Sequence, residues 1–538
     1  MTKLFTTTAL LAALALPAFA PAFAAQPGEG ETLAENQDLK FWILDAFKSL
    51  DPQLTSSRTD SDMIRQLFEG LLNEDSKGAM VPGVAETWDV SDDGLTYTFH
   101  LRDSNWSNGE PVTANDFVYA WQRAVNPETA SEYAWFMELM NLVNATEIVK
   151  GEKAPAELGV KAVDDKTLEV KLTKPTPYFL KTLSHSTTYP VPQAVIEAEG
   201  DAWTQPGKMV GNGAYVLQSH DLGVEAVAVK NDQYWDADNT VIDQVKFITV
   251  NDQNIGLTRY LAGEIDWMNT LPAGRLPQLQ QEYPDEAITA PWSCSYAYIF
   301  NLSDKGPEEL KDIRVRQALS YAIDRDIIVD RVLQGGQRPA YNWVHWATEG
   351  YTIPEEEWGQ WTQAERVEKA KELLAEAGYG PDNPLNLTIQ YNTSEDHKKL
   401  AIAVQQFWKA IGVNVTLNNY EWKVHIDRLN NQDFEVARYA WCGDYNEAST
   451  YLDYFRTGGY NQGKWTNADY DKLLTDSATA ENPNDLYRQA DEILVNDMAL
   501  APVYHYAMAQ MIKPDIRGVP LENVMSAWYA KDMYRVAE

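Results

Sequence analysis

Basic residues, histidines and cysteines are all scarce in this chain. Lys and Arg number 44 against 79 Asp and Glu, which gives a formal net charge of −35. A surface of that sign repels phosphate groups, so we exclude nucleic acids and anionic membranes as partners. We attribute the acidity to solubility in salty surroundings rather than to an acidic functional surface.

Signatures of catalysis are also missing. The seven histidines are scattered, and the sequence contains no His-Glu-x-x-His, Gly-x-Ser-x-Gly or Walker motif. The Gly-Asn-Gly run at 211–213 leads into a strand rather than a helix, so we interpret it as a turn. Many acidic residues and 18 tryptophans leave one enzyme class open, a secreted carbohydrate-active enzyme with two carboxylates across a cleft. We expect a binding protein without cofactor or metal rather than an enzyme.

Long apolar runs are absent after the first 24 residues. A leading lysine, the apolar run 9–16 and the small residues at 22–24 are typical of a cleaved signal peptide over 1–24. No later stretch approaches the roughly 20 apolar residues of a membrane span. The first cysteine is Cys294, so we do not expect a lipid-anchored N-terminus. The pattern predicts a free periplasmic protein.

The two cysteines predict one disulfide, Cys294–Cys442, because the chain is exported to an oxidising compartment. This bond would tie a strand predicted within 437–445 to another predicted near 296–301. The segment 437–445 reads as a strand that runs into a turn. We place this segment at the centre of the protein.

The segment 437–445 also carries charges of both signs. Arg438 and Asp444 stand on either side of Trp441 and Cys442. A cation and an anion that flank an aromatic wall suit a ligand with a charge at each end. A free peptide is such a ligand.

About five hundred mature residues exceed what one core usually supports, so we expect two or three lobes. The clearest pattern is a strand at 386–391, a helix capped by Ser394 and ended by Gly412, and a strand at 413–417. This βαβ unit predicts a parallel sheet in an α/β fold. A helix capped by Thr362 precedes it.

The first half of the chain reads as strands and shorter helices. A helix is predicted over 60–72, and strands on either side of Asp-Asp-Gly at 92–94 predict a hairpin. Thr113 and Asp116 predict a capped helix start. Prolines at 190 and 192 indicate a linker where the chain changes lobe.

Taken together, these stretches resemble the bacterial oligopeptide-binding proteins, which are the receptors of peptide ABC transporters. The resemblance covers essentially the whole mature chain and rests on Ser-Leu-Asp-Pro at 49–52, Phe-Glu-Gly-Leu-Leu at 68–72, the runs 82–86, 111–113 and 315–329, Tyr-Asn-Thr-Ser at 391–394, His-Lys-Lys-Leu-Ala at 397–401, Glu-Trp-Lys at 421–423 and the run 436–447.

The family implies an α/β, three-lobed type II periplasmic binding protein, with a two-segment hinge and the ligand buried between lobes. Applied to this chain, lobe I takes 25–68, 193–293 and 511–538, lobe II takes 69–192, and lobe III takes 294–510. The implied function is that a monomer captures short peptides and delivers them to an inner-membrane permease. Alternatives within the binding class are a receptor for murein tripeptide, or for nickel or haem.

The resemblance also assigns roles to residues. Asp444 matches a family aspartate that pairs with the amino terminus of the peptide. Arg438, His397 and Arg331 match positions that hold the peptide carboxylate, although the family tends to have lysine at position 331. The remaining expected ligand contacts are Asn392, Trp422, Trp441, the backbone of Cys442, and Tyr445. For Trp422 and Trp441, a place in the hydrophobic core is an equally good interpretation.

Two positions depart from the family pattern. A family glutamate shortly after the Leu-Asp-Pro turn is Ser56 here, and a strand glutamate after the first cysteine is Ile299. The loss of these acids is expected to shift the preferred peptide length or side-chain charge.

Overall fold

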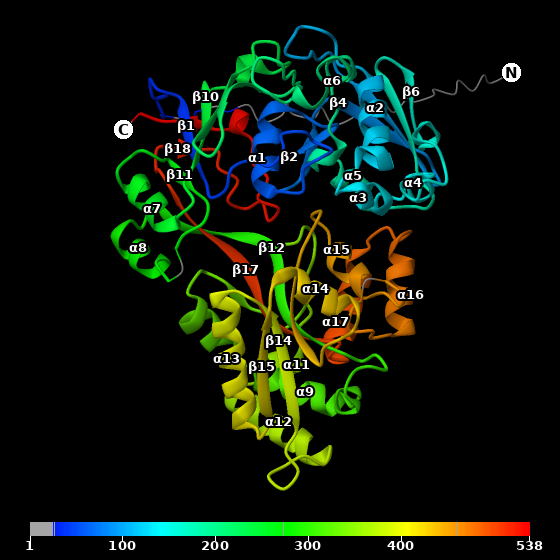
Figure 1. Cartoon of the computed structure of the whole chain (residues 1–538), viewed down its shortest axis with the longest axis vertical. Coiled ribbons are helices and arrows are strands. Elements are labelled where there is room, and N and C mark those ends of the chain that lie inside the picture. Colours follow the sequence, from blue (N-terminus) through cyan, green and yellow to red (C-terminus); the bar gives the residue numbers. More distant parts are fainter. Residues whose placement is uncertain (1–24, 26, 29, 273, 460, 538) are drawn as a thin grey trace, which may run out of the picture.

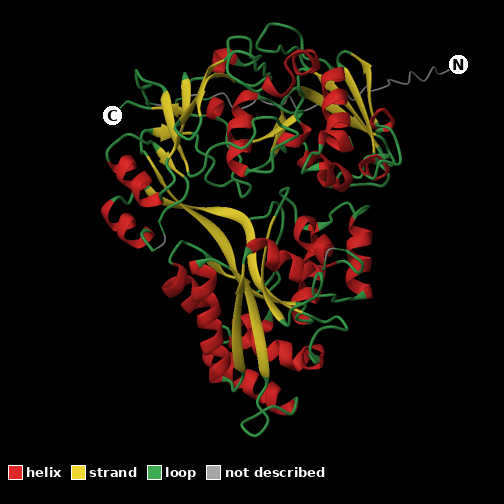
Figure 2. Cartoon of the chain, viewed as in Figure 1, coloured by secondary structure: helices red, strands yellow, loops and turns green. Residues whose placement is uncertain are grey.

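The computed structural model of the chain describes residues 25, 27–28, 30–272, 274–459 and 461–537 (Figure 1). The signal peptide expected at 1–24 lies outside the described residues. Helices and strands are mixed throughout (Figure 2). No helix in the described part of the chain is long and apolar enough to cross a membrane.

One large mixed sheet runs through the described chain and has eleven strands. In spatial order they are β15 (Asn414–Tyr420), β14 (Asn386–Asn392), β16 (Val436–Cys442), β12 (Ala287–Phe300), β17 (Leu500–Ile512), β11 (Trp267–Met268), β1 (Asp38–Ile43), β10 (Gln244–Thr249), β9 (Glu225–Lys230) and β8 (Tyr215–Asp221), with β13 (Arg338–Pro339) paired to β17. The strands predicted for lobe I and for lobe III therefore belong to one sheet.

Two long strands connect the upper and lower parts of the molecule. Figure 1 shows β12 and β17 running together from one part to the other. They are antiparallel, and their register shifts between Pro291 and Ser295 and again between Tyr296 and Ala297. The lobe boundaries predicted at 293/294 and 510/511 fall inside these two strands.

A separate four-stranded sheet lies within the predicted lobe II. Its order is β4 (Ala85–Val90), β5 (Thr96–Leu101), β7 (Thr167–Lys171) and β6 (Val160–Asp164). The hairpin predicted around 92–94 is confirmed as β4 and β5. The helices are α2 (Ala114–Val125), which begins with the capping box of Thr113 and Asp116, α3 (Ala134–Leu139), α4 (Ala145–Val149) and α5 (Phe179–Thr182).

The helices of lobe I are α1 (Arg58–Leu67), α6 (Gln193–Glu199), α7 (Gln253–Leu261) and α8 (Leu276–Glu282). Two small strand pairs complete the upper part of the molecule: β2 (Leu72–Glu74) with β3 (Met80–Pro82), and β18 (Ile516–Arg517) with β19 (Tyr534–Arg535). Most buried side chains of lobes I and II form one continuous hydrophobic core, and a smaller separate core lies around α7 and α8 of lobe I. This shared core holds the two upper lobes together.

In lobe III the predicted βαβ unit is confirmed. β14 and β15 are parallel and are joined by α13 (Glu395–Ala410), whose N-cap is Ser394. Gly412 follows the helix at a φ of +89°, which glycine adopts without steric cost. The other helices are α9 (Ile313–Ala322), α10 (Arg325–Ile327), the π-helix η7 (Ile328–Leu333), α11 (Glu357–Gln360), α12 (Gln363–Glu376), α14 (Trp422–Asn430), α15 (Ser449–Leu452), α16 (Ala468–Ser477) and α17 (Asn484–Asn496).

The lobe III sheet separates two hydrophobic cores. Side chains alternate along a strand, so Tyr296 and Tyr298 of β12 enter one core while Ala297 and Ile299 enter the other. Because β12 also continues into lobe I, a strand packed on both faces forms one of the two connections between the lobes.

The helix predicted over 60–72 is shorter than expected. α1 ends at Leu67, and Phe68 is already extended. The turn at 211–213 packs against this end: the backbone N–H of Gly213 donates to the Leu67 carbonyl oxygen, and the Asn212 side chain bonds both backbone groups of Glu69. This long-range contact ends the helix, although the apolar spacing continues to Leu72.

Candidate ligand-binding site

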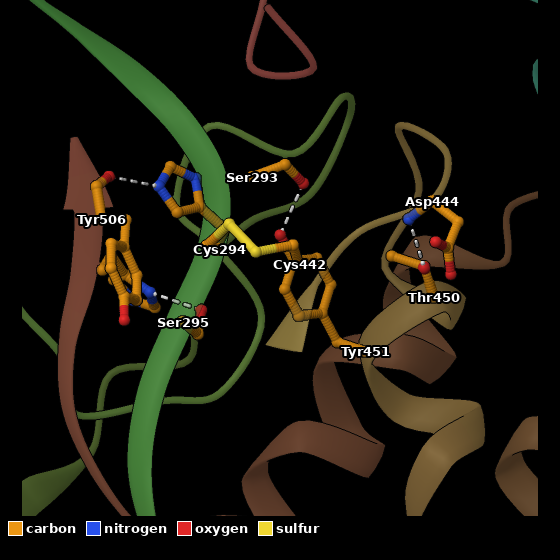
Figure 3. Close-up of a disulfide and its surroundings, with 10 residues drawn as sticks. Ser293, Cys294, Ser295, Cys442, Asp444, Thr450, Tyr451 and Tyr506 are labelled. Atoms are coloured by element: carbon orange, nitrogen blue, oxygen red, sulfur yellow. Dashed lines mark hydrogen bonds between the residues drawn. A yellow bond between two sulfur atoms is a disulfide. The ribbon is translucent and has the colours of Figure 1, made fainter. Parts of the chain in front are cut away.

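The disulfide fixes the strand that carries the predicted charged residues. Cys294 of β12 lies directly opposite Cys442 of β16, and the two are bonded as predicted (Figure 3). Beyond the disulfide, the backbone N–H of Gly443 donates to the Ser293 carbonyl oxygen at 2.7 Å. The turn that holds Asp444 is therefore anchored to β12.

Asp444 lines a cavity of about 350 Å³ between lobes II and III. Its backbone N–H donates to Thr450 Oγ1 at 3.1 Å, and Figure 3 shows no bond to its carboxylate. Lobe III and α3 of lobe II both contribute to the cavity wall, which includes Trp135, Glu138, Leu139, Trp441, Asp453 and Tyr454. The carboxylate predicted to hold a ligand cation thus faces the space between two lobes.

The carboxylate of Asp444 has no ion-pair partner among the described residues. Burial raises its pKa from 3.8 to about 7, because charge is disfavoured where water is excluded. In lobe II, burial and then the negative charge of Asp444 raise the pKa of Tyr133 to about 12. An arriving ammonium group would supply the missing opposite charge.

Lobes II and III already touch beside this cavity. The rings of Tyr178 and Tyr445 are stacked with centroids 4.5 Å apart. Lys181 Nζ donates to the Asn446 carbonyl oxygen at 2.7 Å and lies 2.9 Å from a carboxylate oxygen of Glu349. Lobes II and III are therefore in direct contact at one side of the cavity.

Arg438 lies on the opposite face of β16 from Trp441. Its guanidinium is buried over the Tyr296 ring, 5.3 Å from the centroid, and its Nε has no hydrogen-bond partner among the described residues. Burial lowers its pKa, but the hydroxyls of Tyr506 and Tyr296 outweigh that effect and the pKa is raised overall. Arg438 is therefore a buried cation without a carboxylate, separate from the cavity that holds Asp444.

His397 shares the surroundings of Arg438. It lies in the first turn of α13, and its ring centroid is 5.8 Å from that of Tyr296. Burial lowers the pKa of His397 to about 3, and the charge of Arg438 lowers it too. His397 is thus neutral near pH 7 and offers a hydrogen bond rather than a positive charge, with a buried Nδ1 that is unpartnered within the described ranges.

Arg331, the third predicted carboxylate contact, lies elsewhere. It is exposed on η7 and lines a separate cavity of about 510 Å³ with Asp396 and Lys399. Those two residues form an ion pair at 3.2 Å. The structure brings Arg438 and His397 together, while Arg331 belongs to an outer surface.

The remaining predicted contact residues differ in burial and in the bonds that they already make. Asn392 ends β14 with a buried Oδ1 that has no partner in the described part of the chain. Trp422 is 53% exposed at the start of α14. Tyr445 is a buried part of the cavity wall, and its hydroxyl is hydrogen-bonded to that of Ser449. Cys442 is held by the disulfide.

The two departures from the family pattern have different surroundings. Ser56 bonds through its hydroxyl to the carboxylate of Glu132, so lobe II supplies an acid at this point. Ile299 is 1% exposed in a hydrophobic core, where an unpaired glutamate would be costly.

Sequence reasoning missed the contribution of α3. Trp135 and Glu138 lie some 300 positions before Asp444 in the chain, and no local pattern links them. It also missed a cavity of about 380 Å³ between lobes I and III, near Arg58 and Trp292. Among the described residues, no group of three or more His, Cys, Asp or Glu side chains could hold a metal ion.

Comparison with known proteins gives matches over nearly the whole chain. The family described as bacterial extracellular solute-binding proteins, family 5 Middle, matches residues 79–463. The periplasmic murein peptide-binding protein MppA of Escherichia coli K12 is 42% identical over 530 residues, which is 97% of this chain and 98% of MppA. The periplasmic oligopeptide-binding protein OppA of the same organism is 42% identical over 522 residues, with 96% and 95% coverage.

Solved structures agree with these sequence matches. MppA in its unliganded open form is 41% identical, with a TM-score of 0.86 over 95% of this chain and 99% of that one. Haemophilus influenzae OppA in complex with RPPGFSPFR is 37% identical, with a TM-score of 0.76 over 94% and 100%. The similarity therefore covers sequence and fold together.

Proposed function

This chain belongs to the bacterial extracellular solute-binding proteins of family 5, and from that membership we propose that it captures short peptides and delivers them to an inner-membrane ABC permease. Its fold is the α/β type II periplasmic binding fold predicted from the sequence. The proposal also takes the protein to be periplasmic, monomeric, without a lipid anchor, and a receptor rather than a carbohydrate-active enzyme.

The single observation that supports this proposal most is the pair of unmatched charges. Asp444 is a carboxylate without a cation, and Arg438 is a buried guanidinium without a carboxylate. A buried charge without an opposite charge beside it is unfavourable, so a ligand that supplies the opposite charge is stabilised at both positions. A free peptide carries an ammonium at one end and a carboxylate at the other, and its backbone can pair with strand edges.

Lobe closure around the ligand follows from the connecting strands. The structure is similar to the unliganded open form of MppA, and we take it to represent the open state of this protein. Domain closure about a few hinge residues is a common way to bury a ligand. Here the register shifts of β12 and β17 are the natural hinge positions.

Native mass spectrometry of the protein as purified, followed by release and sequencing of its ligand, tests the proposal. We expect bound peptides with free termini, and binding of unblocked peptides after the ligand is removed by unfolding and refolding. If the protein bound only murein tripeptide, its ligand would be murein tripeptide rather than oligopeptides in general. A non-peptide ligand, or cleaved peptide or sugar fragments, would contradict the proposal.

Peptide affinity should also depend on pH through Asp444. In the unliganded protein its pKa is about 7, so below that pH a proton must leave before the ammonium can pair. Affinity for unblocked peptides should fall by up to about tenfold per pH unit below 7, and N-acetylated peptides should show no such trend. Calorimetric titration between pH 5 and pH 8 measures this difference, and parallel curves for the two peptide forms would refute it.

A further inference from the structure

The cavity beside Asp444 is much larger than an ammonium group requires. Its volume is about 350 Å³, whereas a water molecule, similar in size to an ammonium group, takes about 30 Å³ of liquid. If Asp444 holds the amino terminus, as the proposed function has it, the rest of the cavity is available to the first side chain of the peptide. The wall of the cavity should then influence which side chain that is.

The cavity wall contains a second unmatched carboxylate. Glu138 of α3 is half-buried in the wall, and it has no hydrogen-bond or ion-pair partner for its side chain among the described residues. Asp453 also lies in the wall, but Arg456 holds it at 2.6 Å. No lysine or arginine lines the cavity within the described ranges. One carboxylate is thus left over once Asp444 has bound an ammonium.

Most of the remaining wall is aromatic. Trp135, Trp441 and Tyr454 line the cavity, and the rings of the last two lie 5.3 Å apart. Aromatic and apolar surface packs well against the methylene stem of a lysine or arginine, and the ring faces attract the charge at its end. A short side chain would leave these groups without contacts, and an acidic side chain would add a further negative charge.

We propose that Glu138 is a specificity-determining residue that selects peptides with lysine or arginine at the first position. The amino terminus pairs with Asp444, and the first side chain extends along the aromatic wall to the Glu138 carboxylate. Lobe II thereby contacts the first side chain of the peptide, while lobe III binds its amino terminus.

Calorimetry with Lys-Ala-Ala, Ala-Ala-Ala and Glu-Ala-Ala tests this proposal on the full-length protein freed of ligand. We expect the lysine peptide to bind about tenfold more tightly than the alanine peptide, and the glutamate peptide about tenfold more weakly. Glu138→Gln should reduce both differences to about threefold or less. Glu128→Gln, which removes an exposed charge from the same lobe outside the cavity, should keep both differences.

The outcomes are distinct. Equal affinity of the wild type for all three peptides, or an unchanged preference in Glu138→Gln, would overturn the role of Glu138 while leaving peptide capture intact. Failure of the wild type to bind any of the three would instead contradict the proposed function. Equal effects of the Glu138 and Glu128 variants would show that net charge, rather than the cavity, sets the preference.

Discussion

Replacing Asp444 with asparagine should weaken the binding of unblocked peptides by about 100-fold or more, and N-acetylated peptides by no more than about threefold. Asparagine keeps the size of the side chain but removes the charge, so the ammonium would be buried in the cavity without its partner. Calorimetric titration of the ligand-free protein with both forms of one peptide measures the difference.

Stability provides an independent check on the Asp444 variant. The pKa of this carboxyl is about 7 in the folded protein and 3.8 without burial. The folded state therefore retains a proton that the unfolded state loses, and the unliganded protein should become less stable as the pH rises from about 4 to about 7. Asp444→Asn should remove the contribution of this carboxyl to the pH dependence and raise stability at pH 7 by up to a few kcal/mol.

A matched control is available in the same cavity. Asp453 is already paired with Arg456, so Asp453→Asn should alter the binding of blocked and unblocked peptides equally. If Asp444→Asn weakened both peptide forms to the same extent, Asp444 would not be the ammonium contact.

Replacing Arg438 with methionine should weaken peptides with a free carboxylate by about 30-fold to 100-fold and spare C-terminally amidated peptides. The guanidinium is buried over Tyr296 without a carboxylate of its own, and methionine fills a similar volume without charge. Calorimetry with a peptide and its amide measures the difference, provided that circular dichroism shows an unchanged fold.

The contacts to the two ends of the peptide can be compared in a double variant. Since Arg438 and Asp444 face different surroundings, the effects of their substitutions should add in the double variant. His397→Gln serves as the companion variant, because it keeps a hydrogen-bond donor at a residue that is neutral in the unliganded protein. Equal losses for the free and amidated peptides in Arg438→Met would contradict carboxylate binding at this position.

Local sequence patterns predicted the elements that support the site. Ser394 and Gly412 bound the helix of the βαβ unit because capping and positive φ act within a few residues. The Cys294–Cys442 disulfide followed from cysteine count and compartment alone. These features depend on neighbouring residues or on covalent chemistry, so one sequence suffices.

Features that depend on distant packing were not predictable. The end of α1 at Leu67 is set by the turn at 211–213, and Glu138 reaches the cavity only because lobe II lies against lobe III. The charge state of His397 likewise depends on burial near Arg438. Residue types and spacing do not reveal the opposite wall of a cavity or the loss of water around a side chain.

The continuous sheet has a consequence for ligand release. β12 and β17 pair through their backbones in both halves of the molecule, on either side of the two register shifts, so the two halves do not swing freely as they would on flexible linkers. Closure of the two halves must twist the paired strands β12 and β17. This twist relaxes when the peptide leaves. An emptied receptor should therefore reopen spontaneously and be ready for another round of uptake without any input of energy of its own.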